Sequence, residues 1–454
     1  MTMTRLVSPA ALVALLVSAV PAAAQVQFSG ERMKAHVTFL ADDLLEGREA
    51  GTRGHEIAAR YMAAQLALLG LKPGGENGSW FQPVDLLEAT LIEDATQLTV
   101  RTAAGTTALR HKDTVMLRPP MLLEDLRALG RSGEVTGGRT GGLAGGVPAN
   151  NVVFVGFGMQ DTTLGYDDYA GLDVRGKVVV VLWDSPKGID SEIGAHLRSQ
   201  QSRVAAAHGA IGLFAVPTKA TAAATPWPVI RRLYDEPTTT WIGKDGKAFD
   251  PSYGLQFGGL IDAQAAAGLF EAAPRTLAQI LDEVEQPGAR PAGFALQAAV
   301  SLDQVQVRYR RYVSPEVVGI LEGSDRRLKD EYVALMGHVD HIGTRADGEG
   351  DRINNGALDN AAGAATLIEV ARAFATGPRP RRSLLVVANT AEEKGLLGAE
   401  YFAHYPTVPI AQITAAIDLD MPMLLYDFTD AVAYGSTHST LDAVFAKAGA
   451  AMGV

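Results

Sequence analysis

The last third of the chain alternates between short apolar strands and helical segments, and this alternation constrains the fold more than any other feature. The strand-like segments are rich in β-branched residues, and the segments between them carry apolar residues at helical spacing. The expected strands are residues 317–321, 331–337, 383–390 and 413–421, and the expected helices are Ala361–Ala375 and Gly395–His404. Because apolar strands joined by helices are typical of covered parallel sheets, we predict an α/β fold with a mixed, mostly parallel sheet flanked by helices.

Three segments nearer the N-terminus differ in character. Residues 29–71 show helical periodicity interrupted by a polar turn, which predicts two amphipathic helices. Residues 131–148 are rich in glycine, which favours a loop or linker. Residues 151–216 contain the apolar runs NVVFVGFG, VVVVLWD and IGLFAV, which predict a separate small β-rich domain.

Composition excludes several kinds of partner and site. The chain has 454 residues, with 40 Lys and Arg against 51 Asp and Glu, and its net charge of −11 argues against nucleic acid as a partner. It contains no cysteine, so any bound metal must be held by His, Asp and Glu. Peptides, which are neutral or cationic at their amino end, suit this charge balance better.

The first 24 residues have the layout of a signal peptide. Arg5 supplies a positive charge, the apolar run from Pro9 to Val20 is too short to span a membrane, and three alanines precede Gln25. We therefore expect a secreted or periplasmic protein that does not associate with a membrane after cleavage.

Candidate metal ligands follow three of the expected strands, and one more precedes an expected helix. The candidates are His338, Asp340, His341, Asp359, Glu392, Glu393 and Asp420. In sheets of this kind, sites lie beyond the carboxyl ends of the strands, so these side chains should converge on one rim.

Each candidate alone has a simpler explanation. A pair of adjacent glutamates is usually solvated surface, and Asp359 with Asn360 before a helix is most simply an N-cap. Asp420 differs, because it lies in an apolar strand-like segment where a buried carboxylate needs a partner. A metal ion is the simplest partner. Zinc suits mixed histidine and carboxylate ligands, although manganese or cobalt can occupy the same set.

Metal-assisted hydrolysis of an amide requires these residue types. The ligands must leave an open position for water, and a base must lie near that water. Of the adjacent Glu392 and Glu393, one can bind metal while the other takes the proton. Asp340, two residues from His338, can hold that imidazole in its binding tautomer.

The sequence resembles the di-zinc exopeptidases that include secreted bacterial leucine aminopeptidases. The segments that carry the resemblance are GHVDHIG (337–343), NGALDNAAG (355–363), TAEEKGLLGAEYF (390–402), IDLDM (417–421) and, nearer the N-terminus, LADDLLEGREAGTRG (40–54). Residues 151–184 are similar to the protease-associated domain inserted in that family. The implied organisation is a signal peptide at 1–24, a peptidase domain formed by 25–118 and 296–454, and an inserted domain at 119–295.

The resemblance also implies a role for each site residue. It makes His338, Asp359 and Asp420 ligands of one zinc ion, and Asp359 a bridge to a second zinc ion held by Glu393. The remaining implied features are Glu392 as general base, Asp340 as the partner of His338, and a cis peptide bond between Asp359 and Asn360. The implied activity is that of an aminopeptidase acting through a water activated by two zinc ions.

The sequence departs from the family at the second zinc ion. The family takes a further histidine from a downstream Ser-Asp-His-like motif, which is absent here, so we expect a chain that is incomplete at its C-terminus. We expect His438 to be a solvated loop residue, His341 a loop or wall residue and His404 a packing or surface residue. The alternatives are a carboxypeptidase or a glutaminyl cyclase on the same fold, or a non-catalytic receptor or scaffold protein.

Overall fold

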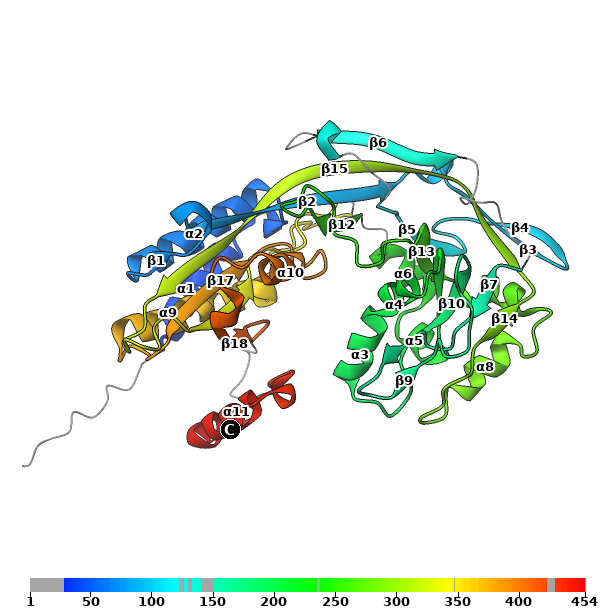
Figure 1. Cartoon of the computed structure of the whole chain (residues 1–454). Coiled ribbons are helices and arrows are strands. Elements are labelled where there is room, and N and C mark those ends of the chain that lie inside the picture. The colour runs from blue at the N-terminus through cyan, green and yellow to red at the C-terminus, as the bar shows by residue number, and fades with distance from the viewer. Residues whose placement is uncertain are drawn as a thin grey trace, which may run out of the picture.

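The structure, a computed structural model, is organised around two β-sheets (Figure 1). It describes residues 28–121, 126–129, 133–140, 150–234, 237–346, 348–422 and 429–453. The expected signal peptide, residues 1–24, lies outside these ranges. Within them, no helix is long and apolar enough to cross a membrane.

The larger sheet has ten strands and is built on one very long strand, β15 (Ala299–Leu321). Figure 1 shows β15 running from the region of β17 and α9 to the region that contains the second sheet. The central strand order is β12 (Thr238–Trp241), β2 (Phe81–Leu91), β15, β17 (Ser383–Asn389), β16 (Tyr332–His338) and β18 (Ile413–Asp418). The remaining strands are β1 (Lys72–Pro73), β3 (Gln97–Thr102), β4 (Gly105–Leu109) and β6 (Gly133–Thr140).

Parallel pairing in this sheet is confined to β16 with its two neighbours, β17 and β18. The other pairs are antiparallel, so the mixed α/β class is confirmed while the parallel share is smaller than expected. The reason lies in the connections. The helices α9 (Gly363–Thr376) and α10 (Leu397–His404) return the chain so that β16, β17 and β18 run in one direction, as helical crossovers do.

Helices cover both faces of β17, and all seven of its residues are buried. Leu384 and Val386 pack in a core with α1 (Gly30–Leu40), α2 (Arg53–Leu68) and α9, whereas Leu385 and Val387 pack with Phe402 of α10. Successive residues of a strand point to opposite faces, so a strand covered on both faces must be apolar throughout.

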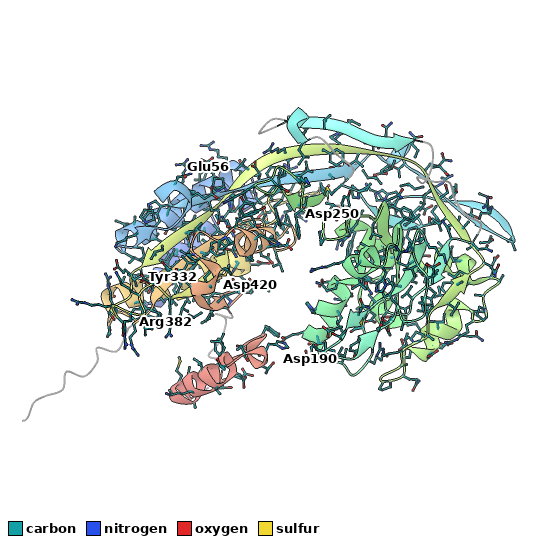
Figure 2. All side chains as sticks on the ribbon, in the orientation of Figure 1. Glu56, Asp190, Asp250, Tyr332, Arg382 and Asp420 are labelled. Atoms are coloured by element: carbon teal, nitrogen blue, oxygen red, sulfur yellow. The ribbon has the colours of Figure 1, made fainter. Side chains whose placement is uncertain are left out.

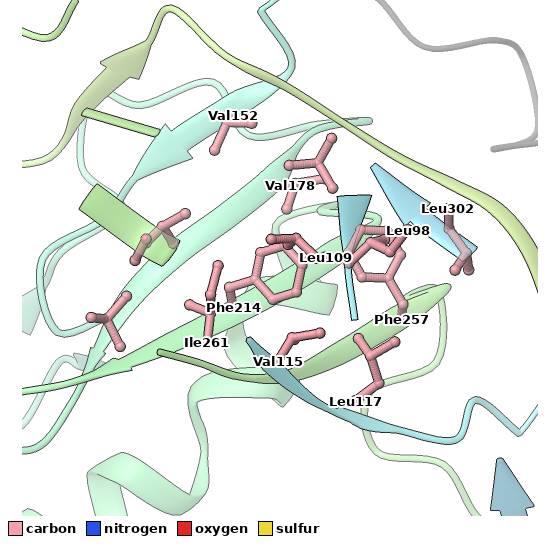
Figure 3. Close-up of a cluster of buried hydrophobic side chains, with 14 of the residues drawn as sticks. Leu98, Leu109, Val115, Leu117, Val152, Val178, Phe214, Phe257, Ile261 and Leu302 are labelled. Carbon is pink, nitrogen blue, oxygen red and sulfur yellow. The ribbon is translucent and has the colours of Figure 1, made fainter. Parts of the chain in front are cut away.

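The second sheet has six strands, and one of its faces packs against strands of the larger sheet in a shared core, part of which Figure 3 shows in close-up. Its strand order is β14 (Phe294–Leu296), β7 (Val152–Phe154), β10 (Val178–Trp183), β11 (Gly212–Pro217), β13 (Phe257–Ile261) and β5 (Val115–Arg118). The pairs among β7, β10, β11 and β13 are parallel, and the edge strands pair antiparallel.

Helices accompany this sheet, so the segment is α/β in character rather than mainly β. They are α3 (Ser191–Ser199), α4 (Gln201–Ala207), α5 (Lys219–Ala224), α6 (Trp227–Leu233), α7 (Ala263–Ala267) and α8 (Leu277–Glu283). The apolar run at β10 is a buried central strand, and parallel neighbours require such crossovers. The last helix, α11 (Leu441–Met452), lies beyond β18.

The glycine-rich segment differs from the expectation of a loop. Its residues 133–140 form β6, which pairs antiparallel with β15, while 141–149 lie outside the described residues. Pairing with a long, already extended strand outweighs the weak strand preference of glycine. The strand β12 likewise belongs to the larger sheet through β2, although it lies in the range 119–295.

Candidate metal centre

The candidate ligands collect at the carboxyl ends of the three parallel strands. His338 is the last residue of β16, Glu392 and Glu393 follow β17, and Asp420 follows β18 (Figure 2). Asp359 lies in the π-helical turn Ala357–Ala362 that leads into α9. The parallel direction of these strands therefore brings together side chains that are far apart in sequence.

The first group consists of His338, Asp359 and Asp420. His338 Nε2 lies 3.2 Å from Asp359 Oδ1 and 3.4 Å from Asp420 Oδ1. The His338 side chain is 2% exposed, and its Nε2 has no hydrogen-bond partner. A buried imidazole nitrogen that faces carboxylate oxygens without a hydrogen bond has the ligand chemistry of a zinc site, so these residues fit a metal ion.

A second group shares Asp359 with the first and adds His341 and Glu393. His341 Nδ1 lies 2.5 Å from Glu393 Oε1, and the His341 side chain is 12% exposed. We expected His341 to be a loop or wall residue, and the sequence reasoning did not place it with Asp359 and Glu393. Its position three residues after His338, just past the end of β16, is the signal that could have identified it.

Asp340 is fully buried, but its carboxylate does not hold His338 as expected. The nearest carboxylate oxygen is 3.8 Å from His338 Nδ1, which instead lies 3.1 Å from the backbone carbonyl oxygen of Asp340. The Asp340 carboxylate accepts hydrogen bonds from the backbone N–H groups of Glu392 and Glu393, at 3.2 and 3.4 Å. Asp340 therefore fixes the backbone that carries the two glutamates.

Asp420 is not buried, which corrects the expectation drawn from its apolar surroundings. Its side chain is 42% exposed, because it follows β18, and β18 pairs only with β16 among the described strands. Asn360 ties this segment to Asp359: its amide donates to Leu419 O at 2.9 Å, and its carbonyl oxygen accepts from Met421 N at 3.2 Å. The peptide bond between Asp359 and Asn360 is cis, as the resemblance implied.

The clustered carboxylates shift one another's protonation. Burial raises the pKa of Glu392 to about 7, and the pKa of Asp340 rises to about 6 for the same reason. Burial and the Glu393 charge raise the pKa of Asp359. Burial disfavours the charged imidazole of His338, but the surrounding carboxylates outweigh it and raise its pKa. The raised pKa of His338 reflects the negative charge of the carboxylates around it, which a cation would neutralise.

Arg48 is 1% exposed and has no carboxylate in hydrogen-bond contact, yet it donates to four backbone carbonyl groups. The acceptors belong to Leu40, Val339, Asn355 and Gly356. Val339 follows His338, and Gly356 begins the turn that carries Asp359. One guanidinium therefore fixes both ligand-bearing segments. Burial lowers the pKa of Arg48 to about 10, which leaves it charged at neutral pH.

The other histidines lie away from both groups. The His404 ring packs 5.0 Å from the ring of Trp241 and 5.2 Å from that of Phe249, and His438 is exposed in a short 3-10 turn.

A mixed α/β fold with histidine and carboxylate ligands at the ends of parallel strands defines the class of metal-dependent hydrolases. Residues 316–454 match the sequence profile of Peptidase family M28. The match begins within β15 and includes every candidate ligand.

Two curated fungal relatives are similar over 106 residues. One, from Pyrenophora teres f. teres (strain 0-1), is 37% identical over 23% of this chain and 22% of its own length; the other, from Pyrenophora tritici-repentis (strain Pt-1C-BFP), is 36% identical over 23% of each. Both are named "Probable zinc metalloprotease". The matched part thus spans less than a quarter of these relatives.

Among solved structures, an aminopeptidase from Aneurinibacillus sp. strain AM-1 is 17% identical, with 87% of this chain and 70% of that chain covered and a TM-score of 0.42. A Peptidase M28 precursor from Shewanella amazonensis SB2B is 16% identical, with 85% and 72% covered and a TM-score of 0.35.

Replacing Arg48 tests its role in fixing the ligand-bearing segments. Arg48→Met removes a donor from four carbonyl groups; Gly356 O keeps the N–H of Ala361, and each of the others that is left buried and unsatisfied costs about 1–3 kcal/mol. We expect a large fall in the urea midpoint of unfolding and a loss of zinc affinity, with partial recovery in Arg48→Lys. Arg60→Met on α2, which removes an exposed ion pair with Glu56 and a contact with the Phe81 ring, is the control and should change little. Equal urea midpoints and equal zinc affinities for Arg48→Met and Arg60→Met would show that Arg48 does not fix the ligand-bearing segments.

Glu316 on β15 gives a pH-dependent prediction. It is fully buried, neither carboxyl oxygen has a hydrogen-bond partner, and burial raises its pKa well above the usual value. The folded state therefore keeps a proton that the unfolded state loses above about pH 4.5, so Glu316 costs stability as pH rises. Glu316→Gln should gain stability over the wild type by up to about 1.4 kcal/mol per pH unit above pH 4.5.

Urea unfolding from pH 4 to 8 measures this difference. Glu322→Gln is the matched control, because Lys72 and Lys329 lower the pKa of that exposed carboxyl and its replacement should give no gain at high pH. A stability difference between Glu316→Gln and the wild type that stays constant with pH would show that Glu316 is ionised in the folded protein.

Proposed function

We propose that the chain is a zinc-dependent exopeptidase, specifically an aminopeptidase that removes N-terminal residues from peptides. The observation that carries this proposal is the buried His338 Nε2, which has no hydrogen bond and lies within 3.2 to 3.6 Å of three carboxylates. The match of residues 316–454 to Peptidase family M28 and the name of the fungal relatives support zinc and peptide hydrolysis.

We further propose two ions, one held by His338, Asp359 and Asp420, and one held by Asp359 and Glu393. The sharing of Asp359 between the two groups supports a bridging carboxylate. Bound zinc would polarise the scissile carbonyl group and lower the pKa of the attacking water.

Glu392 is the proposed general base. Its Oε2 lies 3.6 Å from His338 Nε2, beside the ligands but outside both three-residue groups, so its carboxylate is free to move a proton. The hydrogen bond from Glu392 N to Asp340 holds it in place. Glu392 takes the proton of the attacking water and delivers it to the leaving amine.

The acidic rim, which includes the exposed Asp420, suits a substrate with a free, positively charged amino group.

Glu392→Gln tests the proton transfer. Loss of a general base typically lowers kcat by about 10²- to 10⁴-fold, and Glu392→Gln should do so while zinc content stays unchanged. The measurement is hydrolysis of leucine p-nitroanilide together with metal analysis of the same sample. Glu349→Gln, at an exposed position, is the control. A Glu392→Gln protein as active as the wild type would overturn the mechanism.

The choice of the amino end is tested with pairs of peptides that differ only in an N-acetyl group. An aminopeptidase cleaves the free peptide and leaves the acetylated one intact, whereas cleavage of both from the carboxyl end would indicate a carboxypeptidase.

We also propose that the chain is exported and that residues 119–295 are an inserted protease-associated domain. The positive charge at Arg5, the apolar run and the alanines before Gln25 support export. The core that one face of the second sheet forms with its own helices supports the inserted domain. In a secreting bacterial host, mass spectrometry should find a mature chain that begins at Gln25, and Ala24→Asp should block its formation. An intact N-terminus in the wild-type protein would contradict export.

A further inference from the structure

We infer that His341 is a direct ligand of the second ion, together with Asp359 and Glu393, and that this ion binds after the first and more weakly. The inference rests on the proposed function, because it assumes that the centre holds metal. It assigns the second ion a histidine from the same loop that supplies His338 to the first ion.

The side chains of His341, Asp359 and Glu393 lie close enough together to bind one ion. One ligand atom from each of His341, Asp359 and Glu393 lies within 4.8 Å of the other two. Asp359 is also within this distance of the ligand atoms of the first group. Ions in the two groups would thus share one carboxylate and each have one imidazole, the ligand balance that mixed His and carboxylate zinc sites use.

The backbone holds His341 in this position. His341 N donates to Arg48 O at 3.2 Å, and Gly343 N donates to Gly47 O at 3.1 Å, so the loop is fixed on both sides of Ile342. Gly356 leaves room for the ring, because a Cβ atom there would lie 2.7 Å from His341 Cδ2. A loosely placed wall residue would need neither constraint.

The two groups differ in whether a hydrogen bond must be broken before an ion can bind. In the first group His338 Nε2 has no hydrogen bond to give up. In the second group His341 Nδ1 and Glu393 Oε1 are joined at 2.5 Å, so an ion must replace this bond. A hydrogen bond to a carboxylate is worth enough to weaken binding by about 10- to 100-fold, so the first group should fill first.

Titration of the metal-free, full-length protein with zinc in the presence of a chromophoric chelator tests the inference. The wild type should bind two ions per chain with dissociation constants at least about 10-fold apart. His341→Ala should keep the tighter ion within about 3-fold and lose the weaker one. His438→Ala, which removes an exposed histidine outside both groups, is the matched control and should bind like the wild type.

The outcomes separate the inference from the proposed function. If His341 only restrains Glu393, its removal frees that carboxylate, and His341→Ala would bind the second ion as tightly as the wild type or more tightly. That result, or a wild type that binds a single ion, overturns the inference and leaves a metal-dependent peptidase standing. A wild type that binds no zinc overturns both.

X-ray absorption of the wild type loaded with two zinc ions gives a second test that needs no variant. Ligation by His338 and His341 predicts an average of one imidazole per zinc. An average of half an imidazole would mean that His338 alone is a ligand and would overturn the inference.

Discussion

The centre depends on one imbalance of charge: a buried imidazole nitrogen without a hydrogen bond faces Asp359, Asp420 and Glu392, and no Lys or Arg among the described residues forms an ion pair with these three carboxylates. Asp359, Asp420 and Glu392 each lie within 3.6 Å of His338 Nε2, and burial together with neighbouring negative charge raises the pKa values of Asp359 and Glu392. Protonation relieves the imbalance only in part. A divalent cation satisfies the open nitrogen and the oxygens at once.

The fold produces this imbalance by joining strands that run in one direction. The carboxyl ends of β16, β17 and β18 deliver one histidine and three carboxylates from positions more than 80 residues apart in sequence. Other side chains then fix the ligand-bearing segments through hydrogen bonds to their neutral backbone groups. Arg48 binds the carbonyl groups beside His338 and Asp359, and the Asn360 amide joins Asp359 to the segment that carries Asp420. Asp340 holds the backbone of the glutamates, so the ligands keep their own charges for an ion.

The sequence alone predicts the elements that carry the site. The helices expected at 361–375 and 395–404 are confirmed as α9 and α10 with shifts of a few residues, and the four expected strands are confirmed, because each has a strong apolar pattern. The glycine-rich strand β6 could not be predicted, because its extended form comes from pairing with β15. Long-range pairing of this kind leaves no local pattern in the sequence.

Strand direction also allows the sequence to predict that the candidate ligands converge. The burial of each individual side chain could not be predicted in this way. Asp420 lies in an apolar sequence and is nevertheless exposed, because β18 is an edge strand among the described residues. The role of Asp340 depends on which of its atoms faces His338, and the partnership of His341 with Glu393 depends on loop geometry. Spacing places His341 near His338, but it does not encode the exposure of Asp420 or the orientation of Asp340.

The most direct measurement of the central claim is a crystal structure of zinc-loaded protein with anomalous data collected at the zinc edge. The account predicts an anomalous peak coordinated by His338 Nε2, Asp359 and Asp420, with a second peak about 3.5–4 Å away on the other side of the Asp359 carboxylate. Anomalous density elsewhere, with His338 Nε2 still uncoordinated among the carboxylates, would contradict it.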